Sequence, residues 1–195
     1  MSDLAQDDID WIKQNVRVQV TVPEHWIPRA TELMKFRQKN GAPSAIKNDY
    51  KFCSIFGEYY VGYYYPFLID LNKVNWKSKV DLLHPNGKKG DVKTNNGYIY
   101  WNEELAYIAL VNECNWDQYD FIIFNYYNWY TRDLMIVGWI EKSVFLEKAV
   151  IVPKGKPIIV KDTFKNNSIS FNAHKDTYMV ALEHIKSMEY LKEWL

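Results

Sequence analysis

The sequence predicts a mixed α/β (α+β) protein, built as one domain over residues 1–195 around a central mixed β-sheet flanked by helices. The chain has 195 residues and 48% hydrophobic content, which is enough for one sizeable core. Some segments carry apolar residues at helical spacing, whereas others alternate strictly between apolar and polar residues. One further segment, Asp120–Tyr127, is almost continuously apolar, as expected of a strand buried on both faces.

The N-terminal part of the chain is expected to hold two helices and a strand. Residues 3–15 form an acidic, helix-like segment, and residues 16–22 alternate strictly and predict a strand that ends at Pro23. Residues 28–39 contain helix formers, with a proline in the first turn and Asn40-Gly41 as a stop signal.

A third helix is predicted over Tyr50–Tyr65, because apolar residues recur there at helical spacing. It should end near Pro66, since the residue before a proline disfavours the helical conformation. Glu58 falls outside the apolar stripe of this helix. It is therefore either an exposed helix glutamate or a carboxylate that reaches a site from a packed helix.

The later part of the chain is expected to be rich in strands. The predicted elements are a turn at Thr94–Gly97, a strand at Tyr98–Trp101, strong strands at 120–127 and 134–140, a short helix at 141–149, one or two strands at 157–171, and an amphipathic helix at Tyr178–Leu195. Residues 104–112 fit either a strand or a helix, and a strand is favoured.

The segment Val80–Thr94 carries the strongest functional signal. It is typical of two short strands around a tight turn, with Asp81 on the first strand and Asp91-Val92-Lys93 on the second. Because side chains alternate along a strand, the loop length decides which residue lies opposite Asp81. A two-residue Asn86-Gly87 turn would pair Asp81 with Val92. A three-residue Pro85-Asn86-Gly87 loop would pair Asp81 with Asp91, and its residue types fit a type I turn followed by a left-handed glycine.

Two carboxylates beside one lysine are suited to holding a divalent metal and orienting a water for phosphodiester hydrolysis. The alternative is an exposed hairpin, on which Asp and Lys are common. Six nearby lysines either contact phosphates or discourage edge-to-edge aggregation. They are Lys73, Lys77, Lys79, Lys88, Lys89 and Lys93.

The order of these elements resembles the PD-(D/E)xK nuclease superfamily, which has the restriction-endonuclease-like fold. The elements that carry the resemblance are a helix with Glu58, a strand with Asp81, a hairpin into Asp91-Val92-Lys93-Thr94, and strands that end in Ile136-Val137-Gly138-Trp139-Ile140. The resemblance covers about residues 50–148 and leaves residues 1–49 and 149–195 as additions. More particularly, the chain is similar to small nucleases of this group from phages or microbial defence systems.

The resemblance implies an endodeoxyribonuclease that depends on Mg²⁺ or Mn²⁺. Asp81 would be the metal-bridging acid, Asp91 the second ligand, and Lys93 the residue that orients or activates the attacking water. The carbonyl of Val92 and the carboxylate of Glu58 would add to the metal site. Without metal the close acids repel one another, so at least one should have a raised pKa. One departure is that the Pro of the nominal motif is absent before Asp81, as it is in many members.

Two other classes of protein stay open. A non-catalytic nucleic-acid-binding protein would stack bases on Tyr63–Tyr65 and Tyr126–Tyr130, at about 1–3 kcal/mol per base, although such aromatics equally suit strands and cores. A structural or host-interaction protein would use the acids as solvated surface. Within the enzyme class, DNA or RNA, and a junction-resolving or a sequence-specific nuclease, are all compatible with the sequence. Either nuclease would commonly be a homodimer, because two strands need two active sites.

Composition bears on location and on other cofactors. The formal net charge is zero, which does not favour a large non-specific phosphate-binding surface. Cys53 and Cys114 lie far apart and the four histidines are dispersed, so we expect reduced thiols and no zinc site. There is no apolar run of membrane-spanning length and no signal-peptide pattern at the N-terminus. We therefore expect a cytoplasmic protein, in the host cytoplasm if the chain is viral.

Overall fold

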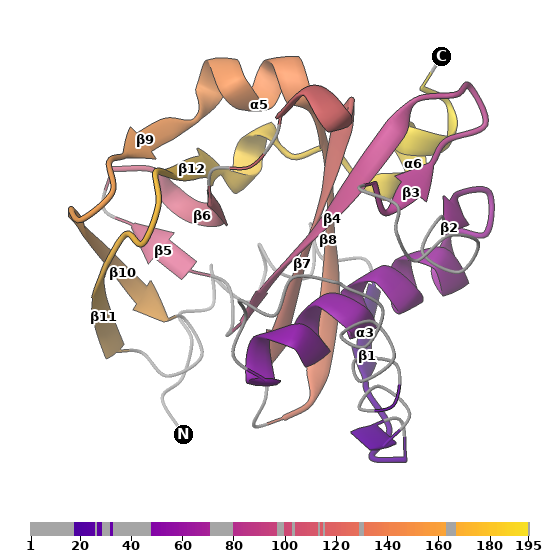
Figure 1. Ribbon diagram of the computed structural model, residues 1–195, viewed down its shortest axis with the longest axis horizontal. Coiled ribbons are helices and arrows are strands. Elements are labelled where there is room, and N and C mark those ends of the chain that lie inside the picture. Colours follow the sequence, from indigo (N-terminus) through magenta and orange to yellow (C-terminus); the bar gives the residue numbers. More distant parts are fainter. Residues whose placement is uncertain are drawn as a thin grey trace.

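The first of two β-sheets draws its six strands from much of the chain (Figure 1). In spatial order they are β1 (Val18–Thr21), β8 (Asp133–Glu141), β7 (Phe121–Asn128), β4 (Lys89–Asn96), β3 (Leu82–Leu83) and β2 (Ile69–Asp70). Only β4 and β7 run parallel, so the predicted mixed sheet is confirmed. The structure is a computed structural model, and it describes residues 18–25, 27–28, 32, 48–70, 80–96, 100–102, 104–112, 114, 116–128, 131–162 and 167–194.

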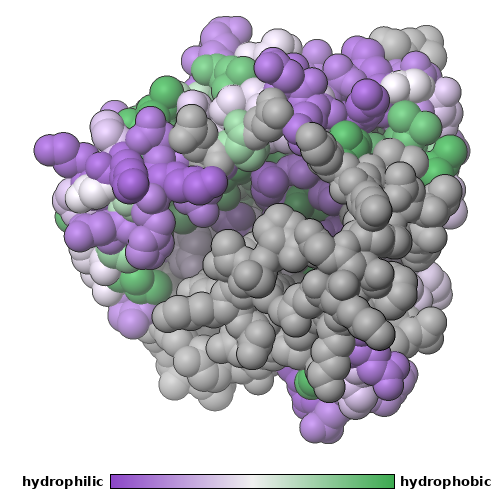
Figure 2. Space-filling model, viewed as in Figure 1, coloured by the Kyte–Doolittle hydropathy of each residue, from purple (hydrophilic) through white to green (hydrophobic). Residues whose placement is uncertain are grey.

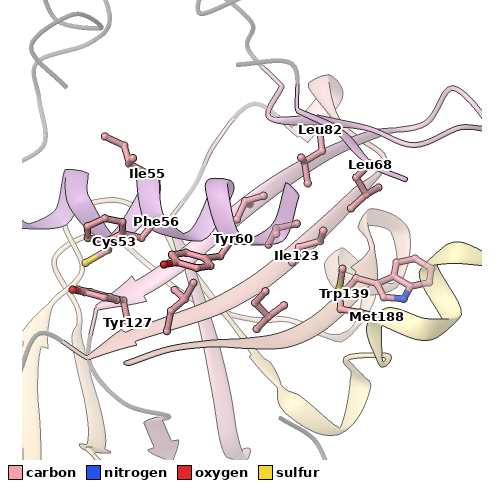
Figure 3. Packing of buried hydrophobic residues seen from close by; sticks show 14 of the residues in the cluster. Cys53, Ile55, Phe56, Tyr60, Leu68, Leu82, Ile123, Tyr127, Trp139 and Met188 are labelled. Atoms are coloured by element: carbon pink, nitrogen blue, oxygen red, sulfur yellow. The ribbon is translucent and has the colours of Figure 1, made fainter. Parts of the chain in front are cut away.

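Helix α3 (Asn48–Tyr64) covers one face of this sheet and confirms the helix predicted over Tyr50–Tyr65 (Figure 1). Figure 3 shows Phe56 and Tyr60 of α3 pointing toward Ile123 and Tyr127 of β7. The rings of Phe56 and Tyr127 lie 5.4 Å apart between centroids. The helix lies close on the sheet at Gly57, where a Cβ atom would overlap Thr94 Oγ1 of β4. A glycine at this position therefore sets how closely α3 approaches β4.

The second sheet also has six strands, and every neighbouring pair is antiparallel. Its spatial order is β11 (Asn167–Asn172), β10 (Pro157–Asp162), β5 (Tyr100–Asn102), β6 (Ala106–Asn112), β12 (Thr177–Ala181) and β9 (Val150–Val152). Together with α5 (Lys142–Lys148) it packs on the face of the first sheet opposite α3, through one shared hydrophobic cluster. The cluster includes Ala109, Val111, Ile122, Phe124, Met135, Phe145 and Val180.

The strands expected in the nuclease-like core, residues 50–148, pair with strands from the segments that were expected to be additions. Strands β5 and β6 come from residues 50–148, yet they form one sheet with β9–β12, which follow residue 148. At the other end, β1 precedes residue 50 and pairs with β8. The boundaries at residues 49 and 148 therefore do not separate structural units.

Most predicted elements in the described part of the chain are confirmed. All eight residues of β7 are buried, as the continuous apolar pattern of Asp120–Tyr127 indicates. The other confirmed elements are β1 within residues 16–22, β5, which overlaps the predicted 98–101 at Tyr100 and Trp101, β6 within 104–112, β8 over 134–140, α5 within 141–149, and β10 and β11, which together match the predicted 157–171 to within one residue.

The predicted amphipathic helix over Tyr178–Leu195 is wrong. Residues 177–181 form β12, which lies between β6 and β9, and only Met188–Lys192 form an α-helix, α6. Between them lies a short 3-10 turn, Leu182–His184. The apolar residues repeat at helical spacing, but pairing on both edges of β12 overrides that local preference. Periodicity alone does not separate a short buried strand from a helix.

The predicted turn at Thr94–Gly97 is also wrong, because Thr94–Asn96 continue β4 alongside β7. The short strands β2 and β9 were not predicted from sequence. The helix predicted over residues 3–15 lies outside the described residues, as does nearly all of the helix predicted over 28–39.

The outer surface is mixed in character. Figure 2 shows hydrophilic residues at the left and top of the view, over strands β9–β11 and helix α5, with smaller hydrophobic patches between them. Among the helices of the described residues, none is long and apolar enough to cross a lipid bilayer.

Candidate active site

The hairpin between β3 and β4 has the register of the predicted three-residue loop. Leu82 lies opposite Gly90, which brings Asp81 level with Asp91. The amide of Gly87 donates to the carbonyl of His84 (2.9 Å), as in a type I turn. Gly87 has a φ of 85°, the left-handed conformation that closes the loop. The sequence argument for the turn is confirmed.

The carboxylate of Asp81 is fixed on the neighbouring strand. Its Oδ2 accepts a hydrogen bond from the backbone N–H of Val92 (2.8 Å). Because the N–H and C=O of one residue point to the same edge of a strand, the Val92 carbonyl also faces the β3 edge of β4. Asp81, Asp91 and this edge are thus brought together.

Asp91 and Lys93 form an ion pair on β4, with Asp91 Oδ2 at 2.5 Å from Lys93 Nζ. The Asp91 side chain is 11% exposed and that of Lys93 is 29% exposed, so solvent reaches the pair mainly at Lys93. Burial lowers the pKa of Lys93, but the charge and hydrogen bond of Asp91, with smaller effects of Cys114 and Asp81, outweigh it and leave the pKa raised. Lys93 is therefore an ammonium group near neutral pH.

Two neutral groups lie beside Lys93. The centre of the Tyr119 ring is 6.0 Å from Lys93 Nζ, and the Tyr119 hydroxyl is 2.5 Å from Cys114 Sγ. Burial, the hydrogen bond with Cys114 and the charge of Asp91 raise the pKa of Tyr119 far above its usual value. Burial also raises the pKa of Cys114, although Tyr119 and Lys93 act in the opposite direction. Both groups stay protonated, so the negative charge next to Lys93 is that of the carboxylates.

The segment that carries Tyr119 is anchored to the start of β4 through Asp120. The Asp120 amide donates to the carbonyl of Lys89 (2.7 Å), and the Lys89 amide donates to Asp120 Oδ2 (2.8 Å). The Lys142 amide donates to the carbonyl of Asp120 (2.9 Å). These bonds place Tyr119 next to the strand of Asp91 and Lys93.

The turn itself is held by C-terminal residues. Buried His84 donates from Nε2 to the carbonyl of Leu191 (2.8 Å), which leaves Nδ1 to accept from the Asn86 amide (3.2 Å). The Asn86 side-chain amide donates to the carbonyl of Trp194 (2.8 Å), and Lys88 Nζ lies 3.8 Å from the centre of the Trp194 ring. These contacts of His84, Asn86 and Lys88 with Leu191 and Trp194, which we call the C-terminal clamp, fix the tip of the hairpin in addition to the pairing of its strands.

Glu58 does not join this group. Asp91 lies opposite Ile122, and Lys93 lies opposite Phe124, on the face of the first sheet covered by the second sheet. Glu58 belongs to α3, which packs on the opposite face. The glutamate is 6% exposed, and its Oε1 accepts a hydrogen bond from Ser54 Oγ (2.9 Å). The alternative of an exposed helix glutamate is thus wrong.

The residues present fit a Mg²⁺ ion in donor type. Asp81 and Asp91 supply hard carboxylate oxygens at one partly exposed end of β4, and Mg²⁺ is usually bound through one or two carboxylates together with water and substrate phosphates. Within the described residues, no group of three or more His, Cys, Asp or Glu side chains is close enough to hold a metal ion.

The other residues singled out from sequence have mixed placements. Lys89 is exposed and Lys88 is engaged with Trp194, whereas Lys73, Lys77 and Lys79 lie outside the described residues. Of the aromatic segments, Tyr63 and Tyr64 are 64% and 40% exposed at the end of α3. Tyr126 and Tyr127 are buried in the first sheet and do not offer a base-stacking surface, which corrects that expectation. Trp129 and Tyr130 are outside the described residues.

Sequence reasoning missed Tyr119, His84 and the role of Cys114. Their contacts join segments that are distant in sequence, and no spacing pattern links Tyr119 to Lys93 or His84 to Leu191. Neither Cys53 nor Cys114 is in a disulfide, so both are thiols, as predicted.

Comparison with known proteins adds no relative. Neither a protein-family model nor a curated protein matches this chain.

Proposed function

We propose that this protein is a Mg²⁺-dependent nuclease of the PD-(D/E)xK type that hydrolyses phosphodiester bonds of DNA. The observation that carries the proposal is the hairpin geometry. Asp81 accepts a hydrogen bond from the backbone of Val92, and Asp91 lies 2.5 Å from Lys93. The register of β3 and β4 brings Asp81 level with Asp91. A solvated hairpin does not require a buried aspartate, yet Asp91 is only 8% exposed.

The architecture supports the same class of protein. A helix, the first acid directly before β3, and a hairpin into the second acid and lysine on β4 follow one another along the chain, and β3 and β4 belong to a mixed sheet. Helix α3 covers one face of that sheet, whereas the second sheet takes much of the other face, where further helices are expected. The mixed central sheet thus supports the proposal, whereas the second sheet stands where flanking helices were expected.

The chemistry assigns a distinct role to each side chain. Asp81, Asp91 and the carbonyl of Val92 would hold Mg²⁺, which when bound neutralises the phosphate and lowers the pKa of a coordinated water. Because Lys93 is an ammonium, it supplies positive charge to the developing transition state and does not itself abstract the proton. Asp91 keeps that ammonium at the site by their ion pair.

The test is cleavage of plasmid DNA and of DNA and RNA oligonucleotides with Mg²⁺ or Mn²⁺, comparing wild type with Asp91→Ala and Lys93→Ala. We expect each variant to lose on the order of 100-fold in rate, with exposed Lys161→Ala as a matched control that cuts normally. Saturating Mg²⁺ should also raise the melting temperature, and Asp81→Asn should abolish that rise. Equal cutting by all variants would overturn the assignment.

A binding function without catalysis has one observation in its favour, the exposed Tyr63 and Tyr64. Such a protein would bind a labelled oligonucleotide in chelator and leave it intact in Mg²⁺. A structural or host-interaction protein would bind neither metal nor nucleic acid. Sedimentation at several protein concentrations would show whether the chain forms the homodimer that cutting both strands commonly uses.

A further inference from the structure

We propose that Tyr119 is a positioning residue that holds the Lys93 ammonium beside Asp91 through the face of its aromatic ring. This inference rests on the proposed nuclease function and names a residue of the same site. The centre of the Tyr119 ring lies 6.0 Å from Lys93 Nζ, which is within the range of cation–π attraction. A lysine ammonium ends a flexible four-carbon chain, so one ion pair with Asp91 leaves it rotational freedom that a second contact removes.

Tyr119 is itself rigidly placed. It is 4% exposed, its hydroxyl contacts Cys114, and its ring meets that of Trp116 edge-on at 5.9 Å between centroids. The next residue, Asp120, is bonded to the backbone of Lys89 at the start of β4. A fixed support of this kind is what holds a long side chain in a productive geometry.

The aromatic ring of Tyr119, and not its hydroxyl, makes the contact with the Lys93 ammonium. The hydroxyl hydrogen-bonds to Cys114 and makes no hydrogen bond with the Lys93 ammonium. Tyr119 also carries no negative charge near neutral pH, because burial keeps its hydroxyl protonated. A phenylalanine should therefore replace Tyr119 in this role, whereas an aliphatic residue should not.

The contact gains importance when Asp91 has a second partner. Two cations that bind the same carboxylate repel each other. The ion pair of Lys93 with Asp91 would therefore be weaker when Asp91 also binds a metal ion. The Tyr119 face then keeps the ammonium near the phosphate. We therefore expect the loss of the ring to lower kcat more than it changes KM.

The experiment compares wild type with Tyr119→Phe and Tyr119→Leu, with Tyr190→Leu as a control at a tyrosine that is 62% exposed. The first measurement is the order parameter of the Lys93 ε-methylene group in metal-free protein, from NMR relaxation at one fixed pH. We expect Tyr119→Leu to lower that order parameter, because the ammonium loses its second contact, and Tyr119→Phe to leave it unchanged. The second is cleavage, in which we expect about a tenfold lower kcat for Tyr119→Leu alone, at unchanged KM.

Two results would overturn the proposal. One is an order parameter of Lys93 in Tyr119→Leu equal to that of wild type. The other is an equal loss of order and of kcat in Tyr119→Phe, which would assign the effect to the hydroxyl and Cys114. Melting curves exclude a global folding defect, and Tyr119→Phe tests the ring even if Tyr119→Leu does not fold. If wild type cleaves nothing, the nuclease proposal fails, while the order parameter of Lys93 in metal-free protein still decides the role of Tyr119.

Discussion

At the scale of single residues, the first sheet buries two tyrosine hydroxyls in their neutral form. Tyr126 and Tyr127 follow one another on β7 and point to opposite faces of the sheet, almost without exposure. Burial raises the pKa of both, well above the usual value for Tyr126 and to about 12 for Tyr127. The hydroxyl of Tyr126 donates to the carbonyl of Ile108, which links the two sheets. Burial of these phenols makes the protein sensitive to alkali.

Tyr127 leads to a prediction about pH. Its pKa rises from about 10 in the unfolded chain to about 12 in the folded protein, so the stability linked to its neutral form is complete below about pH 10. That stability is lost as the pH rises toward 12, because only the unfolded chain then ionises easily. In urea titrations from pH 8 to 11.5, Tyr127→Phe should lose less free energy of unfolding than wild type. Exposed Tyr190→Phe should follow wild type, and parallel curves for all three proteins would contradict the assignment.

At the scale of elements, the β3–β4 hairpin depends on one left-handed glycine. Gly87 has a φ of 85°, and a Cβ atom added there would meet no atom within 4 Å. The cost of a larger residue is therefore conformational and not steric. Since the turn fixes the register of Asp81 and Asp91, strain in the turn acts directly on the acidic pair.

Gly87→Ala should lower the free energy of unfolding by about 1–2 kcal/mol, and Gly87→Asn by less, since asparagine tolerates this conformation. Gly155 offers a matched control, because its φ is 82° and its Cβ position is equally open, in a turn between β9 and β10. Gly155→Ala should cost similar stability in urea denaturation but leave Mg²⁺-dependent cleavage unchanged. Equal losses of cleavage in the two alanine variants would show that the turn at Gly87 has no specific effect on the candidate active site.

At the scale of the whole molecule, one hydrophobic cluster joins the two sheets. Phe145 of α5 is fully buried in it, at 5.3 Å from the ring of Trp116 and 6.1 Å from that of Phe124. The same cluster contains residues of β6 and β12 from the second sheet. The two sheets are therefore expected to unfold together.

Phe145→Ala should lower the free energy of unfolding by roughly 3–5 kcal/mol, because it removes a buried ring from a close-packed cluster. The adjacent residue on the same helix, Leu146, is 40% exposed, and Leu146→Ala should change stability by about 0.5 kcal/mol or less. Far-ultraviolet circular dichroism and tryptophan fluorescence should give coincident transitions for both variants. Two separate transitions would show that the sheets unfold independently.

Local chemistry explains which features were predictable from sequence. The Pro85-Asn86-Gly87 turn is specified by its own residues, and the continuous apolar run of β7 reflects burial on both faces. The strand character of residues 177–181 was not predictable, because it arises from pairing with β6 and β9. Likewise, the approach of Tyr119 to Lys93 depends on how the chain returns to β4 after forming β5 and β6. Such contacts belong to the tertiary structure and leave no local pattern.

The C-terminal clamp on the hairpin has a consequence for the timing of synthesis. His84 and Asn86 bond to carbonyls that lie 107 and 108 residues later in the chain. At about 5–20 residues per second, a ribosome needs roughly 5–20 s to add that stretch. Throughout this interval the nascent chain has its two aspartates but lacks the clamp at the tip of their hairpin. Their final geometry therefore awaits the synthesis of Trp194.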